Sequence, residues 1–196
     1  MSTQPVVVVL AGPNGAGKST VAPALLQESH SAIPFVNADT IERELPTGAT
    51  AGASVRAGRI MLHRMREFGE RRDSFAFETT LASRSFAPWL LGLKEAGYAV
   101  DIIFLWLPSA ETALARVTDR VARGGHAVPP DTVLRRYRRG LENFFQLYLP
   151  LASTWRVYDS SDVTLDLLAQ GLEDGTRRVY DGRRWRLAEL GGVDEN

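Results

Sequence analysis

The amino-acid sequence predicts an α/β fold, a three-layer sandwich in which a parallel β-sheet lies between two layers of helices. Two observations predict it. Short apolar runs alternate with longer segments of helical character along the chain, which is typical of strand–helix–strand units. Several runs, such as VVVVLA at residues 6–11, are continuously apolar, as expected for parallel strands that are covered on both faces.

The elements follow one another in a regular order up to Asp159. We expect strands at Pro5–Ala11, Pro34–Ala38, Ser74–Glu78, Val100–Leu107 and Trp155–Asp159. We expect helices between them, at Lys18–Ser29, Ala51–Arg71, Ser85–Ala96, Ser109–Arg123 and Pro130–Tyr148. The remainder is less regular: Thr164–Gln170 alternates, Glu173–Gly175 signals a turn, and Arg177–Tyr180 could return as a strand.

Length and composition favour a single domain over residues 1–196, because 44% hydrophobic residues can bury one core and no repeat or linker divides the chain. The absence of cysteine excludes disulfides, a thiol nucleophile and a thiolate metal site. The 23 basic and 23 acidic residues cancel, so the net charge gives no general attraction to nucleic acid or membranes. No uncharged stretch approaches the roughly 18 residues that cross a bilayer, and no signal peptide is apparent, so we expect a cytoplasmic protein.

Residues 12–19, GPNGAGKS, match the phosphate-binding pattern G-x-x-x-x-G-K-S between a predicted strand and a predicted helix. The glycines allow the loop to turn its backbone N–H groups towards phosphate oxygens, and the helix that follows adds its positive N-terminal end. We expect Lys18 to reach the β- and γ-phosphates of ATP and the Ser19 hydroxyl to bind Mg²⁺. A chance glycine turn is the alternative. The predicted nucleotide-binding residues are Gly12, Pro13, Asn14, Gly15, Ala16, Gly17, Lys18, Ser19 and Thr20.

Asp39 follows the second predicted strand, and ligands gather at the carboxyl ends of strands in α/β sheets. A carboxylate there could accept the proton of an attacking hydroxyl and help to hold Mg²⁺ through water. The alternative is structural, because an aspartate before residues 40–44 could cap a short helix.

Glu78 ends the third predicted strand, where Thr79 and Thr80 follow it. An acid in this position resembles the Mg²⁺-binding acid of P-loop proteins, and the neighbouring hydroxyls suit a polyhydroxylated acceptor. The alternative is again a helix cap, with the next helix starting at Thr80 or Ser83.

Residues 116–139 are rich in arginine and predict a helical lid. Arg116, Arg120 and Arg123 fall on one helical face, and a Gly-Gly break precedes a second basic helix. Two such helices joined by a short hinge could close over a phosphoryl group in transfer. The second helix carries Arg135, Arg136, Arg138 and Arg139. For most of these arginines the alternative is a solvated basic face, paired with Asp119, Asp131 and Glu142.

Four segments in this order, AGPNGAGKST, FVNADTIE, FETTLAS and RVARGGHAVP, resemble the zeta toxin family of P-loop kinases over residues 6–161. The resemblance implies a P-loop NTPase fold of the nucleotide-kinase type and phosphorylation of the sugar 3′-hydroxyl in UDP-N-acetylglucosamine. It implies roles for five residues: Asp39 as general base, Glu78 and Thr80 as acceptor-binding groups, and Arg120 and Arg123 as phosphate-stabilising lid residues.

We therefore expect an ATP- and Mg²⁺-dependent kinase whose acceptor is a nucleotide-sugar. His126 stands where toxin members have an arginine, so one lid arginine is missing or is supplied by Arg123 or Arg136. The alternatives are a kinase of another metabolite, an antibiotic or a nucleic-acid 5′ end, or a non-catalytic nucleotide-binding switch. A neutral chain without a basic groove of stacking aromatics argues against nucleic acid. An antitoxin partner cannot be inferred from one chain.

Overall fold

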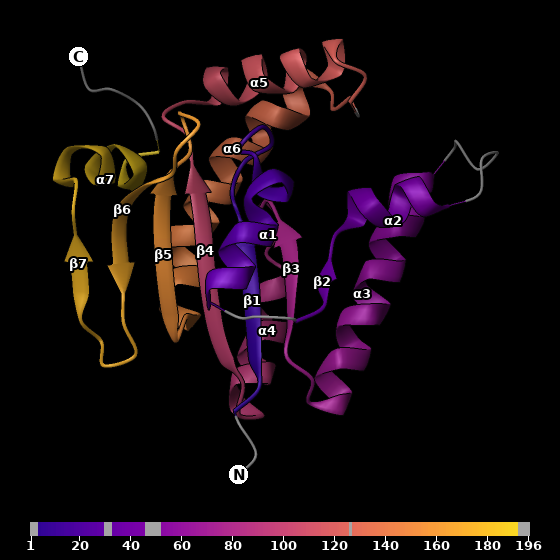
Figure 1. The fold of residues 1–196 in the computed structure, drawn as a ribbon, viewed down its shortest axis with the longest axis vertical. Coiled ribbons are helices and arrows are strands. Elements are labelled where there is room, and N and C mark those ends of the chain that lie inside the picture. Colours follow the sequence, from indigo (N-terminus) through magenta and orange to yellow (C-terminus); the bar gives the residue numbers. More distant parts are fainter. Residues whose placement is uncertain (1–3, 30–32, 46–51, 126, 192–196) are drawn as a thin grey trace.

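The computed structural model describes residues 4–29, 33–45, 52–125 and 127–191, so His126 lies outside the described residues. The described strands form one sheet in the order β2-β3-β1-β4-β5-β6-β7 (Figure 1). The strands are β1 Val6–Ala11, β2 Phe35–Val36, β3 Phe75–Thr79, β4 Ala99–Trp106, β5 Thr154–Asp159, β6 Asp166–Gly171 and β7 Arg177–Val179. The helices are α1 Lys18–Ser29, α2 Ala38–Glu44, α3 Ala53–Arg71, α4 Phe86–Glu95, α5 Ala110–Ala122, α6 Pro130–Asn143 and α7 Gly182–Glu189.

The predicted α/β class is confirmed, and the sheet is mostly rather than wholly parallel. Strands β2, β3, β1, β4 and β5 pair in parallel, whereas β5–β6 and β6–β7 pair antiparallel. A parallel return needs a long crossover, and the residues 160–165 that join β5 to β6 are too few for one. In Figure 1, α1 lies on one face of the sheet and α4 and α6 lie on the other.

The parallel pairing brings the carboxyl ends of the strands to the same end of the sheet. Ala11 at the end of β1 lies opposite Thr79 of β3 and Phe104 of β4, and Val36 of β2 lies opposite Phe77 of β3. The loops that leave these strands therefore meet, and α5 lies across this end of the sheet (Figure 1). This arrangement places the P-loop, the start of α2 and the β3–α4 loop around one space.

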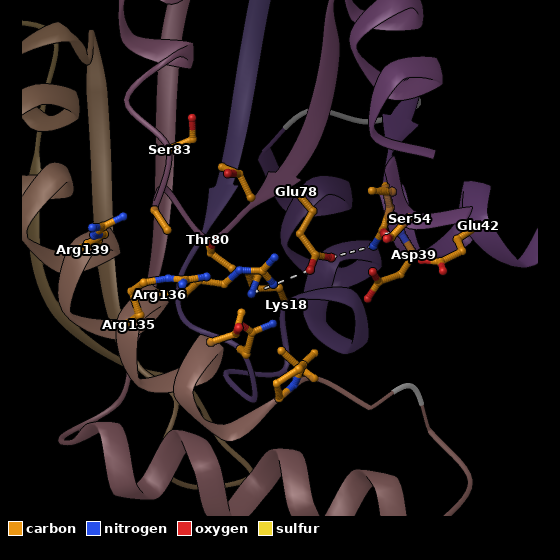
Figure 2. Close-up of a pocket in the computed structure, with 18 of the residues that line it drawn as sticks. Lys18, Asp39, Glu42, Ser54, Glu78, Thr80, Ser83, Arg135, Arg136 and Arg139 are labelled. Atoms are coloured by element: carbon orange, nitrogen blue, oxygen red, sulfur yellow. Dashed lines mark hydrogen bonds and ion pairs between the residues drawn. The ribbon is translucent and has the colours of Figure 1, made fainter. Parts of the chain in front are cut away.

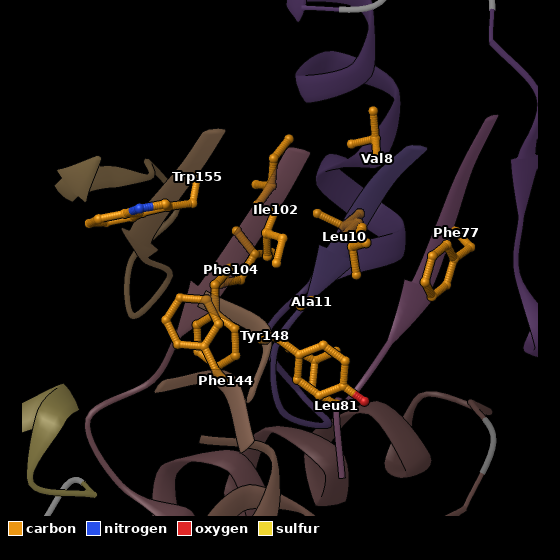
Figure 3. Packing of buried hydrophobic residues seen from close by; sticks show 14 of the residues in the cluster. Val8, Leu10, Ala11, Phe77, Leu81, Ile102, Phe104, Phe144, Tyr148 and Trp155 are labelled. Carbon is orange, nitrogen blue, oxygen red and sulfur yellow. The ribbon is translucent and has the colours of Figure 1, made fainter. Parts of the chain in front are cut away.

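The core sits where the apolar strands meet the helices, as Figure 3 shows. The side chains of β1 from residue 7 to residue 11 are fully buried, which explains their continuous apolar run. Phe104 of β4 stacks on Phe144, with ring centroids 4.3 Å apart. Burying such a side chain contributes about 1.5–3 kcal/mol.

The segment after α6 departs from the predicted single helix over Pro130–Tyr148. The α-helical geometry ends at Asn143, and Phe144–Tyr148 forms a π-helical turn followed by a 3₁₀ turn at Leu149–Leu151. Helix α7, which the sequence did not predict, begins after Asp181, whose side chain accepts from the Arg184 N–H. Within the part of the chain that the structure describes, no helix combines the length and the hydrophobicity needed to cross a membrane.

Candidate active site

The P-loop joins β1 to α1 and is packed too closely for larger residues at two of its glycines. Gly12 has φ +141°, and a Cβ there would lie 2.4 Å from the Leu105 carbonyl oxygen. Gly15 has φ +84°, and its Cβ would lie 2.8 Å from the Ala113 carbonyl oxygen. Positive φ and close backbone approach are the two conditions that require glycine. The loop is therefore seated between the end of β4 and helix α5.

Lys18 is the first residue of α1 and is only 6% exposed. Its ammonium donates to the carbonyl oxygens of Gly12 at 2.9 Å and Pro13 at 2.8 Å, and it lies 3.7 Å from Glu78 Oε1. Burial lowers the pKa of Lys18 below its usual value; the carboxylates of Glu78 and Asp39 oppose this shift, and Arg120 adds to it. A dehydrated ammonium at the mouth of a phosphate-binding loop is well placed to attract an anion.

Ser19, Asn37 and Glu78 form a hydrogen-bonded cluster beside Lys18. Glu78 Oε2 accepts from the Ser19 hydroxyl at 2.7 Å and from Asn37 Nδ2 at 2.7 Å, and Asn37 Nδ2 lies 3.2 Å from Ser19 Oγ. Hydroxyl and carboxylate oxygens are hard ligands, and Mg²⁺ commonly takes one or two of them together with phosphate oxygens. The donor set of Ser19 and Glu78 therefore fits Mg²⁺.

Asp39 lies in the first turn of α2, and the capping role falls to Asn37. Asn37 Oδ1 accepts from the backbone N–H of Asp39 at 2.7 Å and of Thr40 at 3.3 Å. The side chain of Asp39 is exposed and makes no hydrogen bond with another described residue. Its carboxylate is therefore open to the cavity described next.

A cavity of about 740 Å³ opens between α2, the P-loop, the β3–α4 loop and α6. Figure 2 shows Asp39 and Glu42 on one side of Lys18 and Arg135 and Arg136 on the other. The acidic wall consists of Asp39, Glu42 and Glu78; the basic wall consists of Arg135, Arg136 and Arg139. The three arginines of the basic wall make no ion pair with another residue that the structure describes.

Arg120 and Arg123 lie apart from this cavity, in a second hollow of about 440 Å³ along α5. The charge of Arg120 nevertheless contributes to the lowered pKa of Lys18. Arg116 has a structural role: its guanidinium donates to the carbonyl oxygens of Ser160, at 2.6 Å, and of Ser161. The three arginines predicted to share one helical face thus differ in role: Arg116 holds the residues that follow β5, whereas Arg120 and Arg123 line the second hollow.

The β3–α4 loop, which contains the predicted acceptor residue Thr80, is held by α6. Leu81 has φ +54°, a strained value for a residue other than glycine, and its carbonyl oxygen accepts from the buried Asn143 side chain at 2.8 Å. Gly140 lets the helix approach so closely that a Cβ would lie 2.2 Å from the Thr80 carbonyl oxygen. Thr80 lines the main cavity together with Ser83 (Figure 2).

Sequence reasoning missed Asn37 and the part that the second arginine helix plays in the cavity. Asn37 was readable as a cap, because asparagine before Ala-Asp-Thr at the start of a helical pattern is a common N-terminal signal. The orientation of Arg135, Arg136 and Arg139 had no such signal, since it depends on how α6 packs.

The fold and this site define a P-loop kinase. Residues 1–167 match the family model described as "Zeta toxin", so the chain belongs to the zeta toxin family, and the resemblance predicted from the sequence motifs is confirmed.

Individual relatives agree with this assignment. A Haemophilus influenzae protein, described as uncharacterized, is 30% identical over 127 residues, which cover 64% of this chain and 88% of that protein. The structure of the PezAT toxin–antitoxin system of Streptococcus pneumoniae matches with a TM-score of 0.70 at 14% identity, covering 99% of this chain and 82% of the other. The AvrRxo1-ORF1:-ORF2 structure with ATP matches with a TM-score of 0.73 at 20% identity, covering 100% of this chain and 66% of the other. At these identities the two structures show a shared fold.

Proposed function

We propose that the protein is an ATP- and Mg²⁺-dependent kinase that transfers the γ-phosphate of ATP to a hydroxyl of a nucleotide-sugar such as UDP-N-acetylglucosamine. One observation carries the proposal: Lys18 of the P-loop, Glu78 and Asp39 line the same cavity, and the Ser19 hydroxyl donates to Glu78. In this proposal residues 1–196 act as one kinase domain, with a lid over residues 116–139.

The P-loop is suited to hold the triphosphate through its backbone N–H groups, with the Lys18 ammonium at the β- and γ-phosphates. Mg²⁺, held by Ser19 and Glu78 and by Asp39 through water, would neutralise charge on the phosphate oxygens. Arg120 and Arg123 line the second hollow, along α5, and the charge of Arg120 contributes to the lowered pKa of Lys18. In this proposal both arginines would stabilise the charge that develops on the γ-phosphoryl group.

Asp39 acts as the general base in this reaction. The acceptor oxygen forms a bond to the γ-phosphorus while the bond between that phosphorus and the β–γ bridging oxygen breaks, and ADP leaves. The proton of the acceptor hydroxyl passes to the Asp39 carboxylate. Catalysis is otherwise positional and electrostatic, because phosphoryl transfer needs little covalent help from the protein.

The cavity supports an acceptor that combines hydroxyls with negative charge. Thr80, Ser83 and the acidic wall offer hydrogen bonds to a sugar. The basic wall on α6 offers arginines that make no ion pair with a described residue and could therefore bind a negatively charged group. A nucleotide-sugar has both features, and a volume of about 740 Å³ lies within the usual range of small-molecule sites. An antitoxin protein belongs to the proposal as a partner, because the Streptococcus pneumoniae neighbour is part of a toxin–antitoxin system.

The test is to incubate the protein with Mg²⁺ and γ-labelled ATP together with nucleotide-sugars, free sugars, nucleosides and oligonucleotides. We expect label on a nucleotide-sugar and none on the oligonucleotides. Transfer to another metabolite would retain the kinase and replace the acceptor. Release of labelled phosphate to water alone, with every acceptor unlabelled, would contradict the proposal and favour a nucleotide-hydrolysing switch.

A further inference from the structure

Asn37 connects three elements of the site through a single buried side chain. It stands between β2 and α2, its side chain is buried, and it contacts both the first turn of α1 and the end of β3. We propose that Asn37 is a positioning residue that fixes the relative placement of Asp39, Ser19 and Glu78. The inference rests on the proposed kinase function for its consequence and on the hydrogen bonds for its geometry.

Both ends of the Asn37 amide make hydrogen bonds. Oδ1 accepts from the backbone N–H groups of Asp39 and Thr40, and Nδ2 donates to Glu78 Oε2 and to Ser19 Oγ. Backbone N–H groups only donate, so the oxygen must face α2 and the nitrogen must face the P-loop side. The orientation of the amide is therefore determined by its partners, and a flipped amide would lose its contacts with the two backbone N–H groups and with the Glu78 carboxylate.

These contacts place the acidic groups of the site relative to one another. Glu78 Oε2 receives hydrogen bonds from both Asn37 and Ser19, while Oε1 remains on the side of Lys18. The same amide anchors the N–H of Asp39, whose carboxylate extends into the cavity. A displacement of about 1 Å at reacting groups can cost about 10² in rate, so one side chain that joins these elements has a large effect on transfer.

The two ends of the side chain can be separated by mutation. The oxygen end caps α2, and the nitrogen end positions the cluster. Asn37→Asp and Asn37→Ser keep an oxygen that can cap the helix, because serine, aspartate and asparagine cap about equally well. Both remove the amide N–H groups that reach Glu78 and Ser19. Asn37→Ala removes both functions.

The matched control is Asp181→Ala, which removes a cap of the same kind from α7. Asp181 accepts from the Arg184 N–H at 2.9 Å, and α7 follows β7, at the opposite end of the sheet from β2 (Figure 1). We expect this variant to melt at a lower temperature than the wild type and to keep its kcat. It measures what the loss of a helix cap does at a distance from the site, together with the loss of the Asp181–Arg184 ion pair.

The first measurement compares melting temperature with kcat for transfer from ATP to UDP-N-acetylglucosamine. We expect kcat to fall by about 10-fold to 10² in all three Asn37 variants. We expect Asn37→Ser to retain more of the wild-type melting temperature than Asn37→Ala, because it retains the cap. Wild-type kcat in Asn37→Ser and Asn37→Asp would show that Asn37 is only a cap and would overturn the inference.

The second measurement needs no acceptor, so it separates this inference from the proposed function. Calorimetry gives the Kd of ATP in Mg²⁺ and in EDTA for the wild type and for Asn37→Ser. We expect equal affinities of the two proteins in EDTA and about tenfold weaker binding by the variant in Mg²⁺, because the Ser19–Glu78 pair is no longer aligned. An unchanged Mg²⁺ effect in the variant, or no Mg²⁺ effect in the wild type, would overturn the inference. Failure of the wild type to phosphorylate any acceptor would instead refute the kinase proposal.

Discussion

Asp39→Asn is the substitution that tests the proposed chemistry most directly, because it removes the charge of Asp39 without disturbing the contacts that hold α2. Asparagine keeps the size of the side chain and removes its ability to take a proton. The cap of α2 is the side chain of Asn37, which the substitution leaves in place. The exposed Asp39 carboxylate contributes to stability mainly through the helix dipole, an effect of about 0.3–1 kcal/mol.

The expected effect on transfer is much larger than the effect on stability. Loss of a general base slows transfer by about 10² to 10⁴, which corresponds to about 2.7–5.4 kcal/mol in the activation free energy. ATP should still bind, since the P-loop and Lys18 are unchanged. The assay is single-turnover transfer of labelled phosphate from ATP to UDP-N-acetylglucosamine, with the melting temperature measured on the same preparation.

Glu44→Gln is the matched control for this experiment. Glu44 ends the same helix, is exposed and does not line the cavity, so its substitution removes an equal charge from α2 without touching the site. We expect wild-type transfer in this control. Full transfer activity in Asp39→Asn would refute the assignment of the general base, whatever the control shows.

Three further predictions follow from the same geometry. Lys18→Ala should abolish transfer and keep cooperative unfolding. Burial lowers the pKa of Lys18 in the folded wild type, so just below the usual pKa of 10.5 the unfolded state binds more protons than the folded state. Thermal melts should therefore show the stability of the wild type rising relative to that of the variant as the pH increases towards 10.5. Arg120→Ala and Arg123→Ala should each lower kcat by about 10² with little change in ATP affinity. An unchanged kcat in both variants would favour the alternative, in which these arginines only form a solvated basic face. Tyr148→Phe removes the hydroxyl that donates to the Ser83 carbonyl and should cost about 0.5–1.5 kcal/mol at pH 7. Burial raises the pKa of Tyr148 from 10.0 to about 12, so the wild type should lose this advantage as pH rises between those values in denaturant titrations, and a constant difference would contradict the assignment.

The parts of the fold that the sequence predicted are those determined by properties of one short segment of the chain. Continuous apolar runs marked the parallel strands, and glycine spacing marked the P-loop, because burial on both faces and positive φ act on single short segments. The antiparallel strand β6 was less clear, since alternation over Thr164–Gln170 does not say which neighbour it pairs with.

The placement of the arginines illustrates what a single sequence leaves open. Periodicity shows that Arg135 and Arg139 share a helical face, and it does not show which face meets the cavity. The rotation of α6 is set by distant contacts: Gly140 packs on the Thr80 carbonyl, and the Tyr137 hydroxyl donates to the Leu107 carbonyl oxygen at 2.7 Å. Neither partner is adjacent to α6 in the chain, so no local pattern encodes the orientation.

These contacts also place the two helices of the predicted lid in different surroundings. Helix α6 carries the basic wall of the cavity and holds the loop that contains Thr80, through Gly140 and Asn143. Helix α5 packs on the P-loop at Gly15, and its residue Arg120 contributes to the lowered pKa of Lys18. We therefore expect substitutions on α6 to affect the KM of the acceptor and substitutions on α5 to affect kcat. The sequence predicted a lid of two arginine helices over the phosphoryl group, and that lid stays a prediction; in the structure the arginines of α5 and those of α6 line different hollows.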